Sequence, residues 1–450
     1  MNERSASLRS ALTLALLATG IGAALAAEDE AKPPPLPGLP AGLDWSFNFD
    51  ATWGVFGFAH SLYTNPKPEE PSGNLSDNWM EGSIKPALSA EYTTDNDAHI
   101  YAKLSGVGVR TYSAPPPLVG GEASSFDVDD LYIGWRSGTS LPGLGEDALD
   151  FKIGRAPYKL GHLMLVGDGA ADGSTRGGYW TGARKAFELA AIGRFKTGAN
   201  TLEAFYLDKD DIPEADSDSK LWGVNYEYAF GEDTTLGATY MKWSADPAEA
   251  PQRDGLNVYN VRAFTAPFPN FKALSFEAEY AMEDNDTALD STAWNVLVAY
   301  QLETTWKPKI SYRYAFFEGD DPATPKNEAF DGLFTGFYDW GSWWQGEIAG
   351  EYFVSNSNLI SHQLRVHAQP SEAIATGLIF YDFLLDNVES AGVTSDDVAT
   401  EIDWYLDWTI NDHFLVSFVA AAAEPGDAVE QSSGRTDTFW YGMIFAAYSF

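Results

Sequence analysis

Segments of about ten residues in which apolar and polar side chains alternate recur from Asp44 onward, and they constrain the fold more than any other feature. The stretch 401–410 shows the pattern: its even positions are apolar and its odd positions mostly polar, in the sequence Glu401, Ile402, Asp403, Trp404, Tyr405, Leu406, Asp407, Trp408, Thr409 and Ile410. A period of two is that of a β-strand with two different faces. In a membrane barrel the apolar face contacts lipid and the polar face lines a wet lumen, whereas in a soluble sheet the apolar face packs on a core.

The first residues predict an export signal. Two arginines precede a short apolar stretch, and Ala24-Leu25-Ala26 has the form of a cleavage site. We therefore assign residues 1–26 to a signal peptide, with a short membrane anchor as the alternative. Residues 27–43 are charged and rich in proline and predict an extended linker, which leaves residues 44–450 for the strands.

Composition narrows the classes of protein that remain. The chain has 65 acidic and 28 basic residues, a net charge of −37, which argues against nucleic acid as a partner because phosphate would be repelled. The absence of cysteine excludes disulfides, a catalytic thiol and thiolate metal sites. After the leader, no run approaches the roughly 18 apolar residues that a membrane helix needs. An exported chain of this kind is either soluble in the periplasm or inserted in the outer membrane.

Two features favour the outer membrane. Trp and Tyr stand near many strand ends, as in the aromatic girdles of a barrel. Connections also alternate between short ones and long ones, the short at 94–97, 197–200, 231–233 and 411–412, and the long at 61–78, 156–182, 318–341 and 386–398. Short periplasmic turns opposite long extracellular loops are the barrel layout. We expect an all-β fold, a transmembrane antiparallel barrel in a bacterial outer membrane, surrounded by lipid.

The last strand carries a further signal. Residues 435–450 alternate and place Trp440, Ile444, Tyr448 and Phe450 on one face. A strand of this kind that ends on an aromatic residue is what the barrel-assembly machinery of the outer membrane reads, so we expect that machinery as a partner. The alternative is an ordinary edge strand.

Counting gives about nineteen strand-like stretches, whereas bacterial single-chain barrels have an even number. The weakest stretch is 342–354, which follows a long loop and reads equally well as a turn or a short helix. We therefore predict about eighteen strands, with sixteen as the alternative. Because trimeric porins have sixteen, eighteen strands favour a monomer.

Two segments resemble the alginate-export family of outer-membrane barrels. The first, within 127–196, includes Phe151-Lys152-Ile153-Gly154-Arg155 and Tyr179-Trp180-Thr181-Gly182-Ala183-Arg184. The second begins at Lys307 and includes Glu318-Gly319-Asp320-Asp321 and Phe330-Asp331-Gly332-Leu333-Phe334. The resemblance implies an eighteen-stranded barrel that passes an anionic polysaccharide through a pore lined by arginine and lysine. The matching positions are Lys152, Arg155 and Arg184, with Arg136 and Arg194 nearby.

Alternation places side chains of both signs on the inward faces. Besides those basic residues and Arg313, the inward positions hold the carboxylates Glu277, Glu279, Glu401, Asp403 and Asp407. A lumen ringed by carboxylates favours cations and repels a polyuronate. Alternatively, the basic residues pair with neighbouring carboxylates or lie on loops. Selectivity for cations, or passage of neutral or carboxylated small solutes, therefore stays open beside alginate.

The loop from Arg155 to Gly182 is the candidate for a pore constriction. It is long and glycine-rich, and it carries Lys159, Asp168, Asp172 and Arg176. The alternative is a mobile outer loop. Two oxygen-rich stretches, 168–173 and 208–211, are weak candidates for calcium, with solvated acidic loops as the alternative. We predict no other metal and no cofactor.

These patterns predict a channel for small hydrophilic or anionic solutes. The alternatives are a dedicated exporter of an anionic polysaccharide such as alginate, and an adhesion or structural barrel without conductance. A hydrolase with a Ser/His site is a further alternative, but the six histidines are scattered and no G-x-S-x-G, Walker or H-E-x-x-H motif is present. We therefore do not expect an enzyme.

Overall fold

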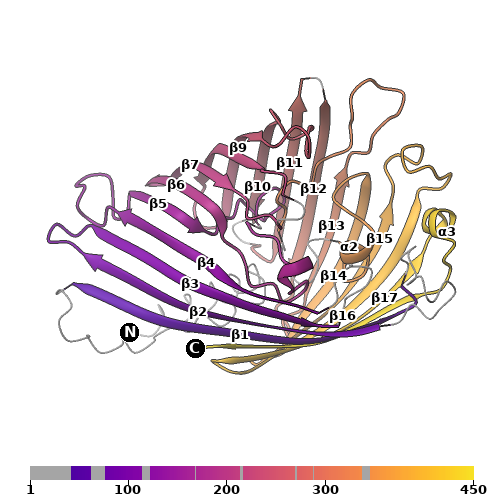
Figure 1. The fold of residues 1–450 in the computed structure, drawn as a ribbon, viewed down its shortest axis with the longest axis horizontal. Coiled ribbons are helices and arrows are strands. Elements are labelled where there is room, and N and C mark those ends of the chain that lie inside the picture. Colours follow the sequence, from indigo (N-terminus) through magenta and orange to yellow (C-terminus); the bar gives the residue numbers. More distant parts are fainter. Residues whose placement is uncertain are drawn as a thin grey trace.

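A computed structural model describes residues 42–61, 77–113, 122–167, 169–212, 216–268, 271–286, 288–336 and 345–450. They form 18 strands in one antiparallel sheet that closes on itself, because β1 pairs with both β2 and β18 (Figure 1). The predicted fold and strand number are confirmed. The stretch at 342–354 is not a strand: its described part forms a turn and the short helix α2 (Ala349–Tyr352). The predicted signal peptide and nearly all of the predicted linker lie outside the described residues.

The strands follow one another around the barrel in chain order. The first nine are β1 (Leu43–Ala59), β2 (Asp77–Thr93), β3 (His99–Tyr112), β4 (Ala123–Arg136), β5 (Leu149–Ala156), β6 (Phe187–Thr197), β7 (Asn200–Asp208), β8 (Lys220–Ala229) and β9 (Thr234–Ser244). The other nine are β10 (Asn257–Thr265), β11 (Leu274–Asn285), β12 (Leu289–Gln301), β13 (Lys309–Phe317), β14 (Leu359–Ser371), β15 (Ile374–Leu384), β16 (Asp397–Asn411), β17 (Phe414–Pro425) and β18 (Phe439–Ser449).

The two faces of each strand differ as the alternation predicts. On β16, Ile402 is 49% exposed on the outside of the barrel, whereas its neighbour Asp403 is 2% exposed on the inside. Ile402 pairs with Phe380 of β15, so that apolar side chains of adjacent strands form a continuous outer belt. A shift of pairing by one residue would bring Asp403 to the lipid and Ile402 to the lumen, and the pattern therefore fixes the register.

The connections at the two ends of the barrel differ. At one end lie tight turns such as 198–199 and 372–373, and Phe49 and Phe450 exchange two backbone hydrogen bonds of 2.9 and 3.0 Å at this end. The connections 157–186 and 318–358 belong to the opposite end. This is the predicted arrangement of periplasmic turns and extracellular loops.

Helices are few and short in the described part. Besides α2 they are the 3-10 turn η2 (Ser174–Arg176) and α3 (Asp427–Ser433). None of the helices formed by the described residues has the length and apolar character needed to cross a membrane.

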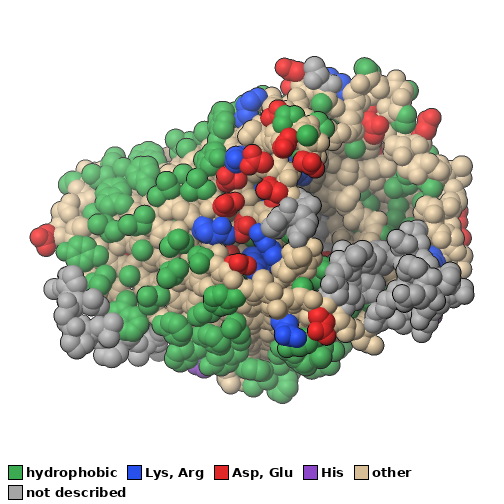
Figure 2. Space-filling model, in the orientation of Figure 1, with side chains coloured by type: hydrophobic (Ala, Val, Ile, Leu, Met, Phe, Trp, Pro, Cys, Tyr) green, Lys and Arg blue, Asp and Glu red, His purple; other side chains and the backbone are tan. Residues whose placement is uncertain are grey.

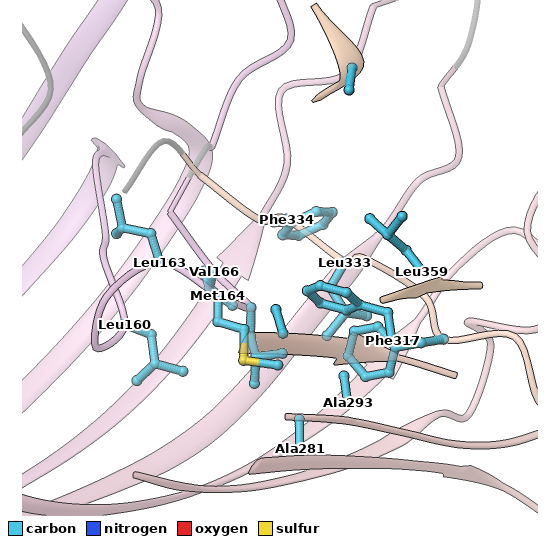
Figure 3. Close-up of a cluster of buried hydrophobic side chains, with 14 of the residues drawn as sticks. Leu160, Leu163, Met164, Val166, Ala281, Ala293, Phe317, Leu333, Phe334 and Leu359 are labelled. Carbon is cyan, nitrogen blue, oxygen red and sulfur yellow. The ribbon is translucent and has the colours of Figure 1, made fainter. Parts of the chain in front are cut away.

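Two long connections fold into the barrel and pack on each other. Val166 and Phe334 form a parallel bridge, and the Gly167 amide donates to the Phe334 carbonyl at 2.8 Å. Figure 3 shows Phe334 beside Leu333, Val166 and Met164, above Ala281 and Ala293 of the inner wall. These apolar side chains are buried, so a core made of loops fills part of the interior of the barrel.

Candidate functional site

Basic side chains line one inner wall, on strands β2 to β6. Lys103 lies 3.1 Å from Asp130, and Lys85 pairs with both Asp129 and Asp130. Lys152 differs: its Nζ lies 5.2 Å from the centre of the Tyr132 ring and donates to the Pro157 carbonyl at 3.4 Å. No carboxylate of the described residues lies within ion-pair distance of Lys152.

A second basic cluster lies on β13 and β14, nine strands from β4 in the ring of 18 and hence on the opposite wall. It comprises Lys309, Arg313, Arg365 and His367. The Tyr405 hydroxyl accepts from Arg365 Nε at 3.1 Å and lies 2.7 Å from His367 Nδ1. Among the described residues, Lys309 has no carboxylate within ion-pair distance.

The predicted inward carboxylates are engaged in contacts with the protein. Glu277 lies 3.1 Å from His162 and 3.8 Å from Arg313. Glu279 accepts from Asn260 at 3.0 Å, and Asp407 accepts from Ser417 at 2.6 Å. These contacts occupy oxygens that would otherwise attract cations.

Glu401 and Asp403 bind the backbone of an inward loop. Glu401 accepts from the amides of Ile348 and Ala349 at 2.8 and 2.7 Å, and Asp403 accepts from the Glu347 amide at 3.1 Å. Both carboxylates are almost fully buried. They therefore do not form the solvent-facing acidic ring that alternation alone suggested.

The predicted arginines occupy different environments. Arg136 lies 2.7 Å from Glu91 near the periplasmic mouth, and Arg155 pairs with Asp210. Arg194 lies 2.7 Å from Glu203 and remains 51% exposed. Arg184 is 2% exposed and is held by Asp172 and Asp127, each at 2.7 Å, so its guanidinium does not face water.

The candidate constriction loop folds inward instead of extending outward. His162 stacks on Phe264 of β10 at 3.9 Å between ring centres, and Tyr158 donates to Glu203 of β7 at 3.4 Å. Burial of Tyr158 raises its pKa well above the usual value, so the hydroxyl stays a donor. The loop thus runs along the inner wall from β7 to β11.

The four charged residues predicted for this loop lie in different places. Lys159 is exposed, and Arg176 lies 2.8 Å from Asp210. Asp172 is bound by Arg184, and Asp168 lies outside the described residues. Across the described part of the chain, no three His, Asp or Glu side chains are grouped to hold a metal ion. Asp172 and Asp210 both bind arginines in this structure. Calcium at these loops stays a prediction.

A cavity of about 510 Å³ lies at the periplasmic end of the first basic wall. Its lining combines rings with charges of both signs and includes Tyr101, Tyr132, Arg136, Lys152, Glu91 and Asp150. Figure 2 shows the same mixture on a larger scale, with basic and acidic side chains gathered at the centre of the molecule and apolar side chains over the flank at left.

The sequence analysis did not identify several residues of the site. Lys309, Arg365 and His367 stand opposite apolar neighbours in alternating strands, so their inward direction was readable, but nothing marked them as a cluster. Lys85 faces Asp129 from 44 residues away. Such contacts depend on the pairing of strands and have no local signature.

Comparison with known proteins places the chain among outer-membrane barrels. Three crystal structures from Pseudomonas aeruginosa resemble it: OccK8 (OprE), OpdQ, and OpdK with vanillate. OccK8 has a TM-score of 0.58 at 13% identity, covering 90% of this chain and 98% of its own. OpdQ has a TM-score of 0.56 at 12% identity, with coverage of 90% and 97%. OpdK with vanillate has a TM-score of 0.55 at 13% identity, with coverage of 90% and 98%.

No curated protein matches the chain in sequence. The sequence profile described as alginate export does match, over residues 97–442, which is most of the chain. Family and fold are those of outer-membrane channels and not of enzymes. The chain therefore belongs to the alginate export family and is a porin-type channel of the bacterial outer membrane.

Proposed function

We propose that this channel passes small carboxylated solutes by diffusion, and that it has no catalytic role. The observation that carries the proposal is the contrast between the two signs of charge in the lumen. The inward carboxylates are occupied by hydrogen bonds and ion pairs, whereas Lys152 and Lys309 lie on opposite walls without an ion-pair partner among the described residues. Two such lysines attract anions from both sides of the passage.

Aromatic rings beside the first basic wall fit the same class of solute. Lys152 lies near Tyr132, and Tyr101 lines the same cavity. A ring and a cation together accommodate a carboxylate attached to an apolar group. OpdK, a barrel of the same fold, has been crystallised with vanillate, which is an aromatic carboxylate.

The test is ion selectivity in planar bilayers under a salt gradient. Wild-type channels should prefer anions. The double variant Lys152→Gln, Lys309→Gln should shift the reversal potential towards the value of a cation-selective channel. Lys272→Gln is the matched control, since Lys272 is exposed on a periplasmic turn beside Asp233. An unchanged reversal potential in the double variant would contradict the assignment of both lysines.

Family membership favours a second candidate, export of an anionic polysaccharide such as alginate. Block of the wild-type current by oligouronates, relieved in the double lysine variant, would support it. Passage of small carboxylates without such block would favour the first candidate. The loop core that fills part of the lumen favours the smaller solute.

We also propose two properties of assembly. The outer-membrane assembly machinery recognises β18, whose outward face carries Trp440, Ile444 and Tyr448 and which is followed by Phe450. The channel is a monomer, as its strand number suggests. Cross-linking in the native membrane tests the second property, which would be contradicted by trimers.

A further inference from the structure

Three carboxyl groups are buried together where the connection between β13 and β14 meets the inner wall. Glu401 and Asp403 belong to β16, and Glu347 precedes α2. Their exposed fractions are 1%, 2% and 2%. Burying one carboxylate without a positive partner is unfavourable, and burying three is more so.

Two of these carboxyls hold the connection to the wall. The amides of residues 347–349 donate to Asp403 and Glu401 at 2.7 to 3.1 Å. Gly346 makes this approach possible, because its φ is +82° and a Cβ there would lie 2.6 Å from Glu401 Oε1. The loop backbone is thus fitted to these two carboxyl groups.

Glu347 is the member without a partner. Neither of its carboxyl oxygens has a hydrogen-bond partner among the described residues, and Asp403 Oδ1 has none either. The titratable groups that face Glu347 are acids and phenols: Asp403 and Glu401 from β16, Tyr381 from β15, Tyr441 from β18, and Glu351 from α2. No basic side chain is among them.

This environment favours the neutral form of Glu347. Burial, and then the charge of Asp403, raise the pKa of Glu347 well above its usual range. Because the folded-state pKa is raised, the docked loop is most stable below the ordinary pKa of glutamate and loses stability as pH rises through the raised value. Protonation removes the charge of Glu347 without requiring a positive partner.

The docked segment also connects to the loop core. Gln345 donates to Asn356 at 2.8 Å, and Asn356 donates to Thr335 at 3.4 Å, next to Phe334. Tyr352 packs against Phe58 and Phe439 of the inner wall, with ring centres 6.2 and 5.5 Å apart. A segment that leaves this wall would therefore loosen the packing that narrows the lumen.

We propose that residues 345–356 form a proton-dependent latch, docked on β16 while Glu347 is neutral and released when Glu347 ionises. Release widens the passage, so the channel conducts more at alkaline pH. The latch rests on the proposed channel function and adds regulation to it.

The experiment is single-channel recording in planar bilayers from about pH 6 to about pH 9. Wild-type conductance should rise about twofold over this range, whereas Glu347→Gln, which stays neutral, should keep the low-pH conductance throughout. Glu389→Gln is the control, because it makes the same chemical change at an exposed position in the outer connection between β15 and β16. A wild-type pH response in Glu347→Gln overturns the latch, whereas no open steps at any pH overturns the channel itself.

A second measurement covers the case in which Glu347→Gln does not assemble. The chain has no cysteine, so Ala349→Cys introduces a single thiol at a buried position of the docked segment. Its maleimide labelling, divided by that of Ser390→Cys on an exposed connection, should increase with pH. A constant ratio would overturn the latch.

Discussion

Two arginines of this barrel show how position decides what a residue contributes. Arg184 is 2% exposed and joins the inward loop to β4 through Asp127 and through Ser125 at 2.6 Å. Arg194 of β6 is 51% exposed and lies 2.7 Å from Glu203 of the neighbouring strand β7. Removing a buried cation leaves its partners without compensation, whereas water screens a cation that is half exposed and lowers its contribution to stability.

We predict that Arg184→Met lowers the free energy of unfolding by about 3 kcal/mol, because it removes an ion pair whose two side chains are only 2% and 11% exposed. Arg194→Met is the comparison variant and should cost less, because Arg194 is half exposed and Glu203 keeps its hydrogen bonds from Tyr158 and Asn225. Urea unfolding in detergent, followed by tryptophan fluorescence, measures both. Equal losses for the two variants would show that burial does not separate them.

Sequence alternation predicts the direction of a side chain but not its partner. It placed Glu277 and Glu401 on inward faces, where the structure also has them. It could not show that Glu277 contacts His162 from 115 residues away, or that Glu401 binds loop amides. Whether an inward carboxylate faces water is decided by these distant partners, which alternation does not encode.

At the scale of elements, the interior depends on two irregular segments that bind each other. Leu165 and Phe334 are joined by a hydrogen bond of 3.0 Å, and Arg253 of a third connection lies 2.5 Å from Asp331. Length and glycine content predicted an inward loop after β5. They gave no indication that the connection after β13 is its partner, since neither segment has a periodic pattern.

Phe334→Ala should loosen this pairing. Phe334 packs on Trp243 at 4.5 Å and on Phe187 at 6.0 Å between ring centres, so truncation removes about 3–5 kcal/mol of core packing. Single-channel conductance should rise, and its fluctuations should increase. Phe126→Ala, at a position 67% exposed on the outer face, should leave conductance unchanged. A rise in both variants would locate the effect outside the loop core.

At the scale of the whole molecule, stability depends on the apolar belt. The strand number was predictable because each strand that crosses the membrane repeats the same two-faced pattern. The rule that bacterial single-chain barrels have an even number of strands then excluded the weakest of the nineteen strand-like stretches. The loops inside the barrel were less predictable, because the segments that fill the lumen have no periodic sequence pattern. A substitution in the apolar belt is therefore the clearest test of the whole barrel's placement in lipid.

Val261→Arg places a charge on the lipid face near the middle of β10, where Val261 is 55% exposed. At the centre of the bilayer this costs about 2–4 kcal/mol. Reversible folding into lipid vesicles measures the change, and Val261→Leu, expected to cost less than about 1.5 kcal/mol, is the control. A neutral effect of arginine would mean that this face does not contact lipid.

The pairing of β1 with β18 sets a condition on biogenesis. Asp50 and Ser449 are partners across the seam although about 400 residues separate them, so the first edge stays unpaired until the last strand arrives. An unpaired edge that long invites pairing with other chains. The polypeptide must therefore be kept apart from its neighbours during transit, and its insertion is an event that follows synthesis rather than accompanies it.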